Sequence, residues 1–523
     1  MSRLTEEQFA VVKSKASLLA VSAFAGTGKT STLVEYAKAR PKARILYIAF
    51  NKSVATEAGD RFPDNVDCRT THSLAFAGFG RKFSDKLGNP QAWEVAQACS
   101  CNPRQAKVIL TTLNAWLCSA DEALGRFHVD MESVRDEVEA GAVVQQAKRA
   151  WELMRSPDSP LRMPHDGYLK LWALSKPKLK VDILLLDEAQ DTNPLTLDLV
   201  MNQRHATIVL VGDRHQGIYG FRRAVNAMEL VEADEQLALT QSFRFGQGIA
   251  DVATHLLRAF KGEVHSVKGR DDILVKWLVD RSQHYALIGR TNAGLFGAAA
   301  SLVEPGKERK LHFVGGFDSY PFGKVLDAFY LWCDERAKIK DASIGRFASF
   351  SDFERYGAEA DDAEVKALVR VVDTYRSRVP VIYNSLKAAE VAVEGRAVVT
   401  LTTAHKGKGL EWEQIELADD FIELPPERDD YNPEEINLLY VAVTRAIKAI
   451  RLPESLVHWL AAEGFVEPSL ARERGVPAKP SQAVTSTTPE VTDRQVADWL
   501  AVNAHRLSES TVNELGGLVS IDR

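Results

Sequence analysis

The 523-residue sequence has few cysteines, no long apolar run and no excess of basic residues. Its five cysteines include no C-x-x-C pair, which argues against a disulfide framework and against a four-thiolate zinc or iron–sulfur site. No run of about 18 apolar residues is present, so we expect no membrane-spanning helix. A formal net charge of -6 argues against a uniformly basic nucleic-acid binder, although a local basic track is compatible with it.

The first ten residues, MSRLTEEQFA, lack the basic and apolar regions of a signal peptide. We therefore expect a cytoplasmic protein, associated with the nucleoid if its source is prokaryotic. At about 150 residues per domain, the length predicts three or four domains.

Short apolar runs alternate with helical stretches through much of the chain, a pattern typical of α/β folds. Two regions, between 76 and 177 and between about 330 and 390, change to helical spacing instead. We therefore expect two parallel-sheet cores, each interrupted by a mainly helical insert. The strand-like runs occupy 17–22, 43–50, 181–186, 207–211, 285–288, 311–314 and 397–401.

A phosphate-binding loop follows the first of these runs. Residues 23–30, AFAGTGKT, fit G-x-x-x-x-G-K-[ST] except at Ala23, which replaces the first glycine. Gly26 and Gly28 let backbone N–H groups converge on phosphate oxygens at a helix N-terminus. Lys29 supplies a positive charge for the β- and γ-phosphates of ATP, and Thr30 supplies a hydroxyl for Mg²⁺.

A second acidic element, VDILLLDEAQD at 181–191, ends an apolar run in adjacent carboxylates. Asp187 suits coordination of Mg²⁺ and Glu188 suits activation of the attacking water. The alternative is that these carboxylates only cap the next helix. Such a hydrolase also needs positive charge opposite the γ-phosphate, and Arg244 and Arg445 are candidates that spacing alone does not select.

In order and spacing, the motifs resemble those of the UvrD/Rep branch of superfamily 1 helicases, over residues 4–455. AFNKSVA at 49–55 and HDGYLKLW at 165–172 resemble the F-box DNA helicase subgroup in particular. Because the chain begins at the helicase core, we expect no F-box and no link to ubiquitin ligation. The other motifs are 4–11 with Gln8, AFAGTGKT at 23–30, TTHSLA at 70–75, LLLDEAQD at 184–191, VGDRHQGIYGFRRA at 211–224, LTQSFRF at 239–245, TTAHKGKGLEW at 402–412 and EEINLLYVAVTRA at 434–446.

The resemblance assigns roles around ATP. Gln8 would bond to adenine, Phe243 would stack on it and Glu411 would reach the ribose. Gln190 and Gln216 would sense the γ-phosphate, and Arg244 and Arg445 would be arginine fingers contributed by the second core. The phosphates would lie against the loop residues Ala25, Gly26, Thr27, Gly28, Lys29, Thr30 and Ser31.

The resemblance also implies a track for single-stranded DNA. Phe221 would stack on a base, and Tyr219 and Arg222 would accompany it; the alternative is that Tyr219 and Phe221 belong to the core. A segment at 148–180 has eight Lys/Arg against three Asp/Glu and contains Trp151, Tyr168 and Trp172, so it is either a basic, aromatic groove wall or a solvated helical face with core aromatics. The remaining residues expected to line the DNA are Phe50, Asn51, Thr71, His72 and His405.

The resemblance further implies two RecA-like cores, ATP and Mg²⁺ as cofactors, and single-stranded DNA, junctions or tailed duplexes as partners. We expect an ATP-dependent helicase or translocase with 3′→5′ polarity. The alternative is a DNA-stimulated ATPase that strips protein–DNA complexes, in recombination control or phage defence, with weak unwinding. The tail is a possible docking element for a protein partner. The expected boundaries are 1–75 and 178–245 for the first core, 76–177 for its insert, 246–330 and 391–455 for the second core, 331–390 for its insert, 456–474 for an extension, 475–491 for a linker and 492–523 for a helical tail.

Overall fold

The computed structural model of the protein describes residues 4–220, 223–303, 309–359, 362–422, 424 and 431–465. Phe221 and Arg222, the linker at 475–491 and the tail at 492–523 lie outside these ranges. None of the helices within them combines the length and the apolar content needed to span a bilayer.

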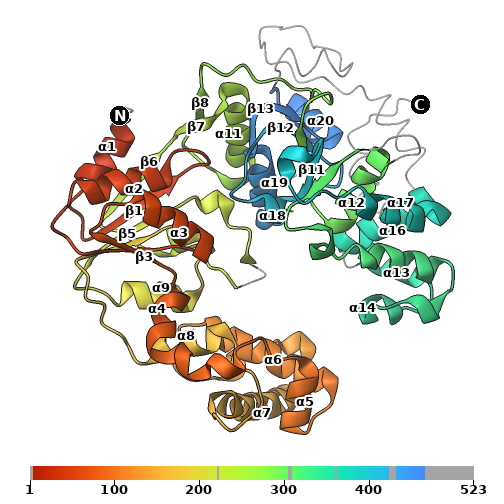
Figure 1. Ribbon diagram of the computed structural model, residues 1–523, viewed down its shortest axis with the longest axis horizontal. Helices are drawn as coiled ribbons and strands as arrows, with labels where there is room; N and C mark the ends of the chain where they lie inside the picture. The colour runs from red at the N-terminus through yellow and green to blue at the C-terminus, as the bar shows by residue number, and fades with distance from the viewer. Residues whose placement is uncertain are drawn as a thin grey trace, which may run out of the picture. The chain divides into compact units, whose positions relative to one another are not determined.

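The first sheet is wholly parallel in its registered pairs. Its central strand β4 is buried along its whole length, as expected for a parallel sheet with both faces covered. Helices α1 (Glu6–Lys13), α2 (Lys29–Lys38) and α3 (Lys52–Arg61) lie beside it (Figure 1). Its order is β3 (Val66–Arg69), β2 (Ile45–Ile48), β4 (Ile183–Leu186), β5 (Thr207–Gly212), β1 (Leu18–Ala23) and β6 (Glu235–Leu239). We call the part built on this sheet, with α9 (Pro194–Met201) and α10 (Ala227–Leu230), lobe 1.

The carboxyl ends of the lobe 1 strands carry the motifs of the sequence analysis. The phosphate loop follows β1, Asp187 follows β4, and the turn 214–216 follows β5. Phe50 and Thr71 come just after β2 and β3. Since parallel strands end at one edge of a sheet, the fold gathers these motifs where α/β proteins bind their ligands.

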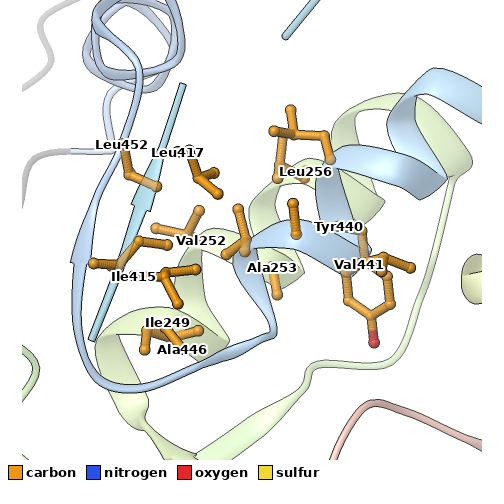
Figure 2. Packing of buried hydrophobic residues seen from close by; sticks show 14 of the residues in the cluster. Ile249, Val252, Ala253, Leu256, Ile415, Leu417, Tyr440, Val441, Ala446 and Leu452 are labelled. Carbon is orange, nitrogen blue, oxygen red and sulfur yellow. The ribbon is translucent and has the colours of Figure 1, made fainter. Parts of the chain in front are cut away.

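The second sheet is also parallel in its registered pairs and forms lobe 2. Helix α11 (Gln247–Lys261) packs with α19 (Pro433–Val443) against its strands, and Figure 2 shows Val252 and Leu256 of α11 beside Ile415 and Val441. The order is β10 (Leu311–Phe313), β11 (Val399–Thr403), β9 (Tyr285–Gly289), β12 (Trp412–Leu417) and β13 (Ala446–Arg451). Its other helices are α12 (Asn292–Ala300), α18 (Ala404–Gly407) and α20 (Glu454–Ala462). A separate two-stranded sheet pairs β7 (Gln241–Gly246) with β8 (Lys268–Arg270), which flank α11 in the chain.

The helical insert of lobe 1 has an apolar core that it shares with Leu195 and Leu199 of α9 and with no strand among the described residues. Trp151, Tyr168 and Trp172 are all buried in this core, so the predicted aromatic groove wall is wrong and the alternative of core aromatics holds. The helices are α4 (Thr71–Ala75), α5 (Ala92–Cys99), α6 (Pro103–Cys118), α7 (Glu137–Arg155) and α8 (His165–Leu174).

The helical insert of lobe 2 instead shares one apolar cluster with the second sheet. Leu368 and Val372 of the insert join Leu287 and Leu401 of the strands in this cluster. The helices are α13 (Gly323–Trp332), α14 (Ala342–Gly345), α15 (Phe350–Glu359), α16 (Ala363–Tyr375) and α17 (Val379–Ala388). The predicted fold class, two parallel-sheet α/β cores with helical inserts, is confirmed.

Candidate nucleotide and nucleic-acid site

The phosphate loop takes a shape that only glycine adopts without strain. Gly26 and Gly28 both have φ of +75°, and Gly28 is the N-cap of α2. A Cβ atom at Gly26 would lie 2.5 Å from Ser242 Oγ and 2.7 Å from Arg244 Cβ. The first N–H groups of α2, which begins at Lys29, have no partner within their own helix, so the loop can bind an anion.

Lys29 and the two carboxylates that follow β4 form one buried charge cluster. Lys29 Nζ lies 2.8 Å from Glu188 Oε2. Burial would lower the pKa of Lys29, but Glu188, Asp187 and Asp213 raise it above its usual value. Burial acts against the charged form of Glu188 too, yet Lys29 and Lys408 hold the pKa of Glu188 at about 2. Both partners are therefore charged at neutral pH.

Thr30 and Asp187 present oxygen atoms suited to Mg²⁺. Thr30 Oγ1 lies 3.5 Å from Asp187 Oδ2, and the buried Tyr47 hydroxyl donates to the same oxygen at 2.6 Å. Among the described residues, no group of three or more His, Cys, Asp or Glu side chains could hold a metal ion. One carboxylate and one hydroxyl fit Mg²⁺, which usually takes its other ligands from phosphates and water.

The predicted γ-phosphate sensors lie on short 3₁₀ turns after β4 and β5. Gln190 Nε2 donates to Glu188 Oε2 at 2.6 Å. Gln216 Nε2 donates to Asp213 Oδ2 at 2.7 Å, and Tyr440 OH of α19 donates to that oxygen at 2.9 Å. The Tyr440 oxygen in turn accepts from the phosphate-loop N–H of Ala25 at 3.1 Å. A lobe 2 hydroxyl thus contacts both the phosphate loop and the sensor turn.

Both predicted arginine fingers lie at this junction. Arg244 donates to Glu411 Oε2 at 2.5 Å and to the Thr444 carbonyl at 3.1 Å. Arg445 is fully buried, and its guanidinium donates to the carbonyls of Val441 and Leu410. Burial and the nearby Arg244 lower the pKa of Arg445 to about 9.

The residues predicted to bind adenine lie beside Gly28 of the phosphate loop. Gln8 is held in α1 by reciprocal hydrogen bonds with Thr5, at 3.1 Å in each direction. Its Nε2 would be 3.2 Å from a Cβ at Gly28, and the Phe243 ring would be 3.6 Å from it. The Phe243 side chain is half exposed, which leaves part of its ring surface accessible. Thr27 is buried and bonds back to the Phe24 carbonyl, while Ser31 is exposed and accepts from Arg61.

Several predicted DNA-contacting residues gather where both lobes meet. The Phe50 and Tyr219 rings stack with centroids 5.7 Å apart and planes within 11°. Tyr219 OH donates to the His405 carbonyl of lobe 2 at 3.4 Å. Because Phe50 is 43% exposed, its ring is accessible to a base.

Asn51, Thr71 and His72 have structural contacts of their own. The Asn51 side chain caps α3 by accepting from the Val54 N–H, and Thr71 is buried in α4. His72 Nε2 lies 2.9 Å from Asp166 on α8. The residue pair thus joins the TTHSLA motif to HDGYLKLW.

Four residues that the sequence analysis did not single out contribute to the site. Tyr47, Asp213 and Tyr440 hold the groups described above, and Lys408 Nζ donates to Asp191 Oδ2 and, at 2.5 Å, to the Gln216 carbonyl. Burial raises the pKa of Asp191 to about 6 although Lys408 opposes the shift. All except Tyr47 lie within motifs named in the sequence analysis, but only the fold shows which groups each of them contacts.

Two parts of the chain match described protein families. Residues 7–222 match the AAA domain, and residues 347–453 match the UvrD-like helicase C-terminal domain. Among curated proteins, F-box DNA helicase 1 of Gallus gallus is 35% identical, with 88% of this chain and 50% of the relative covered. F-box DNA helicase protein 1 of Schizosaccharomyces pombe is 33% identical, with 88% and 58% covered. RecBCD enzyme subunit RecB of Mycolicibacterium smegmatis is 25% identical, with 31% and 15% covered. The chain thus spans 50% to 58% of the length of the two F-box relatives.

Proposed function

Because the chain belongs to the UvrD-like helicases, we propose that it uses ATP hydrolysis to move along single-stranded DNA and separate strands, with 3′→5′ polarity. The observation that carries this proposal is the contact of both lobes with one phosphate loop. Tyr440 of lobe 2 bonds to the Ala25 N–H, and Arg244 lies against Gly26. A motor needs such an arrangement, since its ATP site must report the relative position of two bodies.

In the proposed reaction, water attacks the γ-phosphorus and the bond to the β-phosphate oxygen breaks. Glu188 accepts the proton of the water, while Lys29 and the arginines Arg244 and Arg445 offset the charge on the phosphate oxygens. Thr30 and Asp187 would hold Mg²⁺, which supplies further charge neutralisation. The 2.8 Å contact between Lys29 Nζ and Glu188 Oε2 supports this assignment because both charges already face the same point.

The other residues predicted to contact ATP lie around the same phosphate loop. Gln8 and Phe243 would bind adenine and Glu411 the ribose, while Gln190 and Gln216 would sense the γ-phosphate. Their positions support this distribution: Gln8 and Phe243 flank Gly28, and Gln190 bonds to Glu188. The backbone of residues 25–31 would bind the phosphates.

DNA would run over the edge where Phe50, Tyr219 and His405 meet. Phe221 and Arg222 follow Tyr219 in sequence after Gly220 and stay part of this proposal, together with Asn51, Thr71 and His72. Hydrolysis would change the distance between the lobes, and unequal grip on the strand would turn that change into steps. A docking role for the C-terminal tail and a cytoplasmic location also stay within the proposal.

A second candidate function is a DNA-stimulated ATPase that strips proteins from DNA and unwinds weakly. The small second insert favours it, because α13 to α17 share their apolar cluster with the second sheet instead of forming a separate core. Such an insert offers less independent surface for engaging a duplex.

One set of assays tests both candidates. ATP turnover is measured with and without single-stranded DNA, and strand separation is measured on 3′- and 5′-tailed duplexes. Lys29→Ala is the control that should abolish turnover. Strong separation of the 3′-tailed duplex supports the helicase, whereas DNA-stimulated turnover with displacement of bound protein and little separation supports the second candidate. Turnover that ignores DNA would contradict both.

A further inference from the structure

A buried carboxylate outside the predicted site joins lobe 2 to the sensor turn. Glu263 follows Gly262, whose φ of +60° ends α11 and turns the chain back. The Glu263 side chain is only 2% exposed. Its Oε2 accepts from His215 Nε2 at 2.7 Å and from Arg214 Nε at 3.1 Å, and its Oε1 accepts from the backbone N–H and Nδ1 of His265, both at 2.9 Å.

The donors to Glu263 come from both lobes. Arg214 and His215 belong to the 3₁₀ turn of lobe 1 that ends in Gln216, whereas His265 lies two residues beyond Glu263 in lobe 2. Oε2 therefore points to lobe 1 and Oε1 to lobe 2. Burial alone would raise the pKa of Glu263, but the donors from His215, His265 and Arg214 hold it well below its usual value.

His215 is fixed in one orientation by its neighbours. Its ring stacks on Phe24 of the phosphate loop, with centroids 6.0 Å apart, and meets Tyr440 edge-on at 6.2 Å. Since the Glu263 carboxylate can only accept, Nε2 carries the proton. In the described part of the chain, Nδ1 is buried and has no hydrogen-bond partner. The polar contacts of this ring therefore lie at Nε2, which is 2.7 Å from Glu263 Oε2 and 3.3 Å from Arg214 Nε.

We propose that Glu263 is a positioning residue that fixes the Gln216 turn relative to lobe 2. The inference rests on the proposed function, in which Gln216 senses the γ-phosphate. Asp213 already holds the Gln216 side chain, and Glu263 holds the two residues between them. When α11 moves with lobe 2, the hydrogen bonds of Glu263 with Arg214 and His215 transmit that movement to the sensor turn. Gln216 itself makes neither of these bonds.

The test is Glu263→Gln, which keeps the volume of the side chain but replaces one carboxylate oxygen by an NH₂ group. This group cannot accept a hydrogen bond from the donors that face it. We expect the DNA-stimulated kcat to fall about tenfold while the KM for ATP stays within about twofold, because the contact acts on hydrolysis and not on binding. The distance moved per ATP should fall as well. His265→Ala is the matched control, since it removes a donor from the same carboxylate without touching lobe 1, and it should stay near wild type.

Arg214→Ala approaches the same contact from lobe 1 and guards against a folding defect, because the Arg214 side chain is 37% exposed. Non-additive loss in Arg214→Ala/Glu263→Gln, with unchanged melting temperatures, supports the proposal. Wild-type kcat and step size in Glu263→Gln, or a loss that His265→Ala reproduces, overturns it. If Gln216→Ala loses DNA stimulation while Glu263→Gln does not, only this inference fails; if Gln216→Ala keeps it, the sensor assignment fails.

Discussion

At the residue scale, buried charges in this protein are distinguished by what they contact. Lys29 faces carboxylates, whereas Lys170 of α8 donates to the carbonyl oxygens of Ser119 and Asp121, at 2.8 and 2.7 Å. Carbonyl groups carry no full charge, so they offset the desolvation of a lysine less than a carboxylate does. Lys29 therefore stays charged, whereas the charged form of Lys170 is less favoured in the folded protein.

Replacement of Glu188 by glutamine should separate ATP binding from hydrolysis. Glutamine keeps the shape of Glu188 but cannot take a proton from water, so we expect turnover to fall by about 10²-fold or more. ATP affinity, measured by fluorescence titration with a labelled nucleotide, should stay within a few-fold. Wild-type turnover in this variant would mean that another group activates the water.

Lys170→Met should change how stability depends on pH. Burial lowers the pKa of Lys170 from 10.5 to about 8, so the folded state binds fewer protons than the unfolded state between these values. The free energy of unfolding of the wild type should therefore rise with pH in this window, by up to about 1.4 kcal/mol per pH unit more than in the variant. Urea denaturation between pH 8 and 10.5 measures both slopes. Parallel slopes would contradict the assignment.

Sequence alone located the residues with strong local motifs and missed those whose role depends on a distant contact. Lys29 and Asp187 stand in loops that follow apolar strands, so their types and positions predict a phosphate and metal site. Tyr47 reads as one more apolar strand residue, and Glu263 as a surface carboxylate after a helix. Their partners are 140 and 48 residues away in sequence, and only the fold brings them together.

At the scale of elements, the phosphate loop depends on glycine for two separate reasons. Gly26 has a positive φ, and its α-carbon also lies close to Ser242 and Arg244 of β7. The close approach brings Arg244 to the loop. A side chain at this position would therefore disturb both the loop and the arginine.

Gly26→Ala should weaken ATP binding and lower the free energy of unfolding by about 1–3 kcal/mol, since its Cβ would meet Ser242 Oγ at 2.5 Å in a strained conformation. Gly59→Ala is the matched control. Gly59 lies inside α3, where a Cβ meets nothing within 4 Å, so the change should stabilise the protein by about 0.5–1 kcal/mol. Thermal unfolding and nucleotide titration of both variants check this. Equal effects would contradict the argument.

Most central strands were predictable from sequence, with β12 as the exception, and most edge strands were not. The run at 181–186 predicts β4, whose four residues are all buried. In contrast, β3 alternates between half-buried and exposed residues, and β6 contains Glu235 and Gln236. An edge strand is covered less than a central one, so its sequence has a weaker apolar signal. The same reason explains why β13, with Lys448 in its middle, was not predicted.

At the scale of the whole molecule, an acidic protein is proposed to hold a polyanion. The chain has 71 acidic against 65 basic residues, so long-range attraction does not explain DNA binding. Affinity must come from a local track in which stacking contributes as well as phosphate contacts. Stacking and charge differ in their response to salt, which allows the two contributions to be measured separately.

Phe50→Ala should weaken binding of single-stranded DNA by about 1–3 kcal/mol, because the exposed ring beside Tyr219 is lost as a stacking surface. The slope of log K against log salt concentration should stay unchanged, since that slope counts phosphate contacts and the ring has no charge. Fluorescence anisotropy at several salt concentrations gives both quantities. Phe127→Ala, which removes an exposed phenylalanine from the lobe 1 insert, is the control and should change neither. A shallower slope in Phe50→Ala would instead mean that the ring positions cationic side chains, and the proposed path of the bases would have to move away from the stacked pair.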